Sequence, residues 1–113
     1  MESILTSIKE LLGPGSSDGF DTDIIIHINT ALMDLRRLGV GPVTGFRIED
    51  ETTTWNDFLS DEEMLRLEAI KDYVYLNVKE VFDPPASGSH MDSLHKRLEK
   101  LEWTINVAAE SEV

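Results

Sequence analysis

The chain has 113 residues and carries 22 acidic against 10 basic side chains, which gives a formal net charge of −12. The length suits one domain, residues 1–113, and the charge disfavours wrapping nucleic acid or resting on an anionic membrane, because both need clustered Lys and Arg. The absence of cysteine excludes disulfides and thiolate metal sites, and no apolar run approaches the roughly 18 residues of a membrane span.

Apolar periodicity predicts two helices in the first third of the chain. Residues 2–12 form a short amphipathic helix. A second helix begins with Asp21 as its N-cap and with Phe20 packing on Ile25 as a hydrophobic staple. It ends at Gly39, which suits the left-handed position after a helix. The core stripe of this second helix comprises Ile24, Ile28, Ala31, Leu35 and Leu38.

Residues 40–59 break the helical pattern. Phe46-Arg47-Ile48 alternates apolar with polar and Glu49-Asp50-Glu51 resembles a turn, so this segment could form a short two-stranded β-hairpin. Thr54 and Asp57 can cap a single helical turn over residues 55–58. A loop of this length in a small domain is either functional or disordered, and its aromatic side chains argue against disorder.

The broadest apolar surface belongs to residues 60–85. A capping box of Ser60 and Glu63 marks the start of a helix, and two prolines mark its end, so we predict one helix from Asp61 to Phe82. A face of this width predicts a central helix that contacts all the others. The face comprises Leu65, Leu67, Ala69, Ile70, Tyr73, Val74, Leu76, Val78, Val81 and Phe82.

A last helix is predicted from a cap at Ser89 to about Ala109. At 100° per residue, Trp103 falls almost opposite the core stripe of this helix, and Val107 lies one turn further on. Trp103 therefore either tucks under a loop of its own chain or meets another subunit. The core stripe comprises Met91, Leu94, Leu98, Leu101, Ile105 and Ala108. The predicted fold is all-α, a bundle of about four helices with a long loop between the second helix and the central helix.

No residue pattern predicts catalysis, a cofactor or a metal site. His27 lies at the margin of an apolar helix face, where a packed or solvent-edge histidine is the commoner case. His90 and His95 are five residues apart and cannot share a metal in the manner of an i, i+4 pair. The acidic clusters lack the alternating ligands and the glycine of a calcium loop. We therefore expect a protein that is not an enzyme.

Apolar and aromatic side chains are the candidates for a functional surface. Trp103 and Val107 form the second face of the last helix, and the loop adds aromatic side chains that could equally pack within their own chain. The predicted interface residues, toward neighbouring copies or another protein, are Phe46, Ile48, Trp55, Phe58, Trp103 and Val107.

Several short stretches carry a resemblance through their order and spacing. They are Gly39-Val40-Gly41-Pro42, Thr54-Trp55-Asn56-Asp57-Phe58, Tyr75-Leu76-Asn77-Val78-Lys79, Phe82-Asp83-Pro84-Pro85, and Leu101-Glu102-Trp103 with Asn106-Val107. Together they resemble the head-tail connector, or adaptor, family of long-tailed bacteriophages, in the version found in phages and prophages of Gram-positive hosts. Thr104 departs from the family pattern, in which a basic residue is expected after the tryptophan.

The resemblance implies a structural virion protein, made in the host bacterial cytoplasm, that forms a ring under the portal protein. Such a ring is usually dodecameric, extends the DNA channel, and offers a docking surface to the next head-completion or tail protein. DNA would pass through it without specific binding, and no membrane or cofactor is implied. The competing interpretation is a small acidic helical interaction module or regulator that binds a partner helix. A small acidic enzyme or a DNA mimic fits the sequence least.

Overall fold

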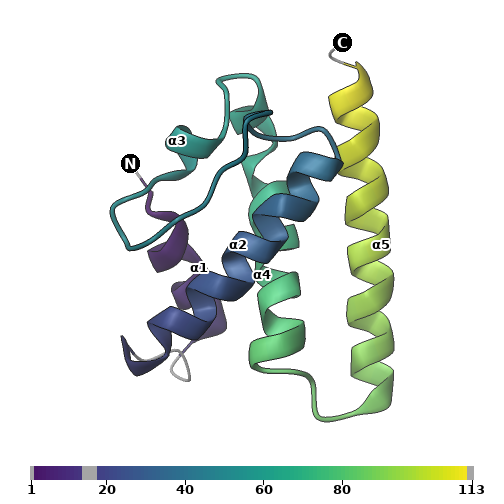
Figure 1. The fold of residues 1–113 in the computed structure, drawn as a ribbon. Coiled ribbons are helices and arrows are strands. Elements are labelled where there is room, and N and C mark those ends of the chain that lie inside the picture. Colours follow the sequence, from purple (N-terminus) through teal and green to yellow (C-terminus); the bar gives the residue numbers. More distant parts are fainter. Residues whose placement is uncertain (1, 14–17, 112–113) are drawn as a thin grey trace.

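Helices dominate the computed structural model, which describes residues 2–13 and 18–111. Figure 1 shows α2 crossing in front of α4, with α1 on one side and the long α5 on the other. The predicted all-α bundle is confirmed. The described residues form five α-helices rather than about four, because the single turn expected after Thr54 is itself an α-helix. The α-helices are α1 (Ile4–Leu12), α2 (Asp21–Arg37), α3 (Trp55–Phe58), α4 (Leu67–Phe82) and α5 (Gly88–Ser111); two 3₁₀ helices are η1 (Asp18–Phe20) and η2 (Glu63–Arg66).

The helix α4 occupies the predicted central position, because it packs against α1, α2 and α5. The end at Phe82 and the Ser60–Glu63 capping box are confirmed: the Ser60 N–H donates to the Glu63 carboxylate at 2.9 Å, and the Glu63 N–H donates to the Ser60 hydroxyl at 3.1 Å. The start at Asp61 was wrong. Arg66, with φ −113° and ψ 21°, separates a 3₁₀ turn from the α-helix.

Two residues of the predicted α4 face lie outside the core. Leu65 precedes the α-helix and is 83% exposed, and Val81 in the last turn is 58% exposed. Tyr73, Ile70 and Val74 are buried as predicted. The core extends over all five helices and into the loop; its largest fully buried side chains are Ile4, Leu5, Ile8, Ile24, Ile28, Leu32, Leu35, Ile48, Trp55, Ile70, Tyr73 and Ile105.

Two predicted helix caps differ from the structure. The N-cap of α2 is Phe20 rather than Asp21, because the 3₁₀ turn of η1 leads directly into the helix; the Phe20 ring contacts Phe82 edge-on, with centroids 5.5 Å apart. The helix α5 starts before the predicted Ser89 cap, since the Ser87 hydroxyl accepts the His90 N–H at 3.2 Å. The helix continues to Ser111, two residues past its predicted end.

The end of α2 matches its prediction. Gly39 follows Leu38 with φ 95°, and its N–H donates to the Arg36 carbonyl at 3.0 Å. The Val40 N–H donates to the Leu35 carbonyl at 2.9 Å, which completes a Schellman motif.

The predicted hairpin over residues 46–54 does not form. Instead, the Asn29 side chain of α2 bonds both backbone groups of Ile48. The Asn29 amide N–H donates to the Ile48 carbonyl at 3.0 Å, and the Asn29 side-chain oxygen accepts the Ile48 N–H at 2.7 Å. Thr54 pairs with Ser3 in an isolated antiparallel bridge. The partners that a hairpin strand would supply therefore come from α2 and from the segment before α1.

Candidate functional site

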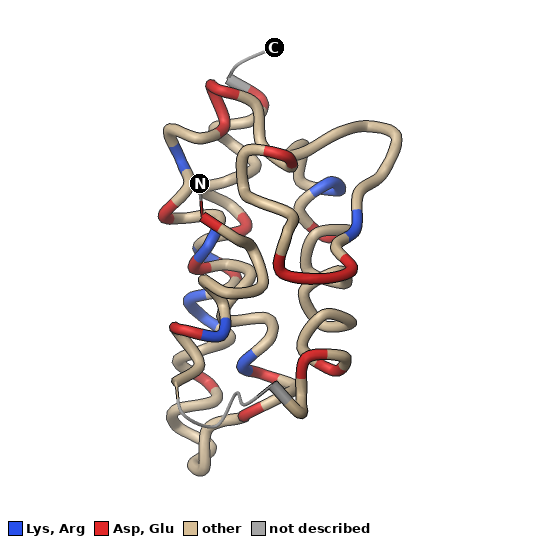
Figure 2. Tube along the Cα trace, turned by 90° about the vertical axis from the view of Figure 1, so that its left-hand side faces the viewer, with Lys and Arg blue, Asp and Glu red and all other residues tan. Residues whose placement is uncertain are grey.

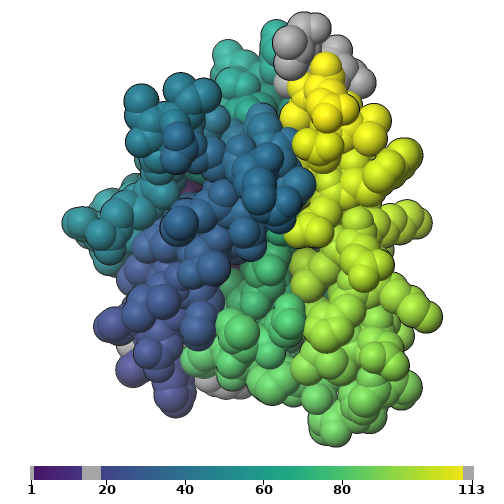
Figure 3. Space-filling view, turned by 45° about the vertical axis from the view of Figure 1, so that its right-hand side comes forward, coloured from purple at the N-terminus to yellow at the C-terminus, as the bar shows by residue number. Residues whose placement is uncertain are grey.

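The outward face of α5 carries the most exposed aromatic side chain in the described part of the chain. Trp103 is 69% exposed and Val107 is 39% exposed, while Leu94, Leu101 and Ile105 on the opposite face are buried. Figure 3 shows α5 as an open ridge along one edge of the molecule. Trp103 is therefore not covered by a loop of its own chain, and the two-faced helix that the sequence predicts is present.

Polar contacts fix the orientation of α5, and so of Trp103. Glu102, the preceding residue, accepts the Tyr73 hydroxyl at 2.8 Å and contacts the Arg37 guanidinium at 3.4 Å. One turn later, the Asn106 amide donates to the Leu38 carbonyl at 3.1 Å. Burial, reinforced by the Glu102 carboxylate, raises the pKa of Tyr73, so its hydroxyl remains a donor. The helix thus joins both α2 and α4 beside the tryptophan.

The loop places most of its predicted interface residues inside the protomer. Ile48, Trp55 and Phe58 are 0%, 0% and 3% exposed, and Phe46 is half-buried against the Phe58 ring at 5.0 Å. The Trp55 indole N–H donates to the buried Ser7 hydroxyl at 2.9 Å. These four side chains therefore pack within their own protomer. Contact of the six predicted residues with another protein stays a prediction. Among them, Trp103 and Val107 are the exposed side chains.

Hydrogen bonds to several helices hold this loop against the bundle. Besides the bonds between Asn29 and Ile48, the Gly41 N–H donates to the Glu63 carboxylate at 3.1 Å. The Ile4 N–H donates to the Thr53 carbonyl at 3.0 Å. The loop therefore has a defined path in the isolated protomer, so the surface that its acidic residues present is already formed.

That surface lies at the edge of the molecule opposite α5. A hollow of about 370 Å³ is lined by Leu5, Thr6, Lys9, Asp21 and Glu51, and the Lys9 ammonium lies 2.7 Å from the Asp21 carboxylate. Figure 2 faces this edge and shows the run of acidic residues 49–51 beside α1. Hydrogen bonds from the Thr52 hydroxyl and backbone N–H lower the pKa of Asp50. The hollow joins residues from α1, α2 and the loop, a combination that no local sequence signal indicates.

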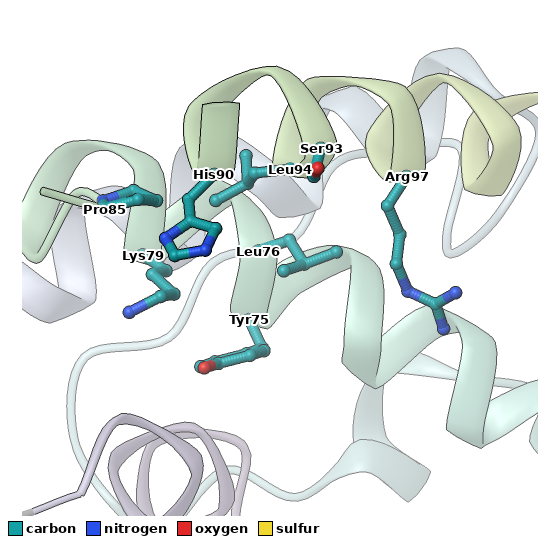
Figure 4. Close-up of a pocket in the computed structure, with 8 residues that line it drawn as sticks. All are labelled: Tyr75, Leu76, Lys79, Pro85, His90, Ser93, Leu94 and Arg97. Carbon is teal, nitrogen blue, oxygen red and sulfur yellow. The ribbon is translucent and has the colours of Figure 1, made fainter. Parts of the chain in front are cut away.

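An apolar groove of about 430 Å³ runs between α4 and α5. Figure 4 shows Leu76 and Leu94 facing each other within it, with His90 and Lys79 toward Pro85 at one end and Arg97 at the other. The cations of its rim are paired within the chain: Arg97 lies 2.7 Å from Asp72, and Lys79 lies 3.6 Å from Asp83. The groove therefore offers apolar contact but little unbalanced charge.

Further apolar side chains are exposed on α2 and on the loop. Ile26 and Met33 are 55% and 69% exposed, and seven residues of separation put them on one side of α2. Val43 in the loop is 80% exposed. The monomer thus presents apolar surface on more than one side, which is typical of a subunit with several contacts.

The histidines singled out in the sequence line surface hollows or contact a carboxylate. His27 lines a small hollow with Asn77 and Glu80, His90 lines the α4–α5 groove, and His95 lies 3.0 Å from Glu80. Within residues 2–13 and 18–111, no three His, Cys, Asp or Glu side chains converge as metal ligands. None of the described helices combines the length and hydropathy needed to cross a bilayer.

Comparison with known proteins gives one match. No curated protein and no solved structure is significantly similar to the chain. A family model described as phage connector protein, however, matches residues 4–112. This match spans α1 to α5, including the loop and the Trp103 face. The chain therefore belongs to the phage connector protein family.

Proposed function

We propose that this connector protein assembles as a dodecameric ring beneath the portal, where it extends the DNA channel and gives the next head-completion or tail protein a surface to bind. Family membership makes the protein a structural component of the virion that interacts with other head or tail proteins. The ring, its stoichiometry and the portal contact go beyond this and constitute the proposal.

One observation carries the proposal: Trp103 is 69% exposed on a helix whose other face is already used by the core. A small monomer gains nothing from displaying a large indole to water, whereas tryptophan is among the residues that most often anchor interfaces. The polar contacts of Glu102 and Asn106 hold the helix around it. The Trp103 face is therefore preorganised to bind, which lowers the entropic cost of association.

The charge of the protomer suits a channel for DNA. Each copy carries a formal charge of −12, so a ring concentrates negative charge around its axis. Acidic walls repel phosphate and let DNA pass without adhering. We expect part of this charge to line the channel; an assembled ring with a strongly basic channel would contradict the proposal.

The direct test is Trp103→Ala, with Leu65→Ala as the matched control. Both residues are exposed, and Leu65, at 83%, lies on η2 rather than α5. Loss of a desolvated tryptophan anchor costs about 2 kcal/mol, which lowers affinity roughly thirtyfold. We expect Trp103→Ala to reduce incorporation into rings on the portal of the same phage, measured by pull-down and electron microscopy. Circular dichroism should show both variants folded.

The control decides the interpretation. Equal incorporation of Trp103→Ala, Leu65→Ala and the unmodified protein would show that the Trp103 face is not part of the connector contact. If Trp103→Ala instead lost its fold, the tryptophan would belong to the core, contrary to its exposure.

A further inference from the structure

The two long edges of the protomer are suited to a head-to-tail contact. Its principal extents are 40 × 33 × 20 Å, so the molecule is a slab. Figure 1 shows α5 at one edge and α1 with the loop at the other, with α2 and α4 between them. In a dodecamer each copy turns by only about 30° relative to the next, so the two surfaces that meet must lie on nearly opposite sides of the subunit. The two edges meet this requirement.

The same geometry argues against other exposed apolar surfaces as the complement of α5. Figure 1 shows α2 in front of α4, so the outward face of α2 looks away from α4. Ile26 and Met33 are exposed on this helix. A surface at a steep angle to the α5 edge would impose a large rotation between copies, which cannot close a twelve-membered ring. The edge formed by α1 and the loop remains.

The chemistry of that edge matches what surrounds Trp103. The hollow is lined mainly by polar side chains, because its one apolar residue, Leu5, is only 2% exposed, and the Asp21 and Glu51 carboxylates can accept the indole N–H. Lys100 lies one turn from Trp103 on the exposed side of α5. The opposite edge carries exposed acids at Glu49, Asp50 and Glu51. The α5 edge carries both signs of charge, with Glu99 beside Lys100, so the complementarity is local: Lys100 can pair with the run of acids of the next copy.

We infer that Trp103 of one copy docks into the hollow formed by Leu5, Thr6, Lys9, Asp21 and Glu51 of the next copy, with Lys100 beside Glu51. This inference rests on the ring proposed above and adds the surface that receives the tryptophan. The loop takes part in the contact through its acidic residues 49–51 rather than through its aromatic residues, which pack inside the protomer. Because Asn29 and Ser7 fix the loop, the hollow exists before assembly.

The absence of cysteine permits a clean proximity test. Lys100→Cys and Glu51→Cys would be made as separate variants, mixed, assembled on the portal, and treated with a short bis-maleimide. We expect a heterodimer band that requires both variants and disappears when Trp103→Ala is added. The matched control mixes Lys100→Cys with Met33→Cys, since Met33 is 69% exposed on α2 and does not line the hollow. This control pair should not cross-link.

A charge swap gives an independent readout. Lys100→Glu and Glu51→Lys should each lower ring formation at least tenfold. A single chain that carries both substitutions restores the opposite charges at every contact, so it should recover most of the lost ring formation. Rings that form normally while the Lys100–Glu51 pair fails to cross-link and the swap fails to rescue would overturn this inference and leave the proposed function intact. Failure of the unmodified protein to form any ring on the portal would overturn both.

Discussion

Gly41 at the start of the loop is the position where one added methyl group should cost the most. The residue has φ 91°, and a Cβ built on it would lie 2.4 Å from Cε1 of Phe58. Phe58 is 3% exposed and packs against Phe46 with the two rings tilted by 53°, so it must shift to admit the methyl group, although a hollow of about 110 Å³ adjoins both rings. A left-handed alanine costs about 1 kcal/mol and overpacking about 2 kcal/mol more. Gly41→Ala should therefore destabilise the protomer by about 3 kcal/mol, or about 12 °C in Tm.

Gly45 provides the control within the same loop. Its φ is 96°, but a Cβ there would have only the end of the Arg36 side chain within reach, at 3.8 Å. Gly45→Ala should cost about 1 kcal/mol, or about 4 °C, because only the backbone term applies. Thermal melts of both variants compare the two terms directly. Equal shifts would refute the reasoning, since they would show that Phe58 yields without cost.

Three further predictions concern the core and its pH dependence. Val74→Asp should leave the protein unfolded by circular dichroism, because an unpaired charge would enter the core. Ser7→Ala should cost about 1–3 kcal/mol by denaturant unfolding, since the Trp55 N–H loses its buried acceptor; the loss should vanish in a Trp55→Phe background. Above pH 10 the unfolded chain releases the Tyr73 proton while the folded state keeps it, so stability should fall with pH less steeply in Tyr73→Phe.

Local patterns predicted what local chemistry determines. The Ser60–Glu63 box, the end of α4 at Phe82 and the position of Trp103 opposite the core stripe all follow from residues within two turns of one another. Leu65 was assigned to the core because helical spacing was extended backward into a segment that forms a 3₁₀ turn. There the period is three rather than 3.6, so its side chain points elsewhere.

The loop was harder to predict because its partners are distant in sequence. Phe46-Arg47-Ile48 has the alternation of a strand, yet its backbone partner is the Asn29 side chain, 19 residues earlier. Trp55 is buried through Ser7, 48 residues away. The proposed receiving hollow likewise joins α1, α2 and the loop. Periodicity identifies which residues are apolar or turn-forming, but not which remote polar group will satisfy an isolated backbone amide.

The way the loop is fastened has a consequence for hydrogen exchange. The Ile48, Gly41 and Trp55 amides belong to a long connection, but their partners are Asn29 of α2, Glu63 of η2 and the Glu2 carbonyl before α1. Opening any one of these bonds disturbs contacts of buried side chains, so these amides should exchange at the rate of global unfolding rather than of loop fluctuation. Loop and helices then form a single foldon, and a protease would find no early cleavage site between Gly41 and Trp55.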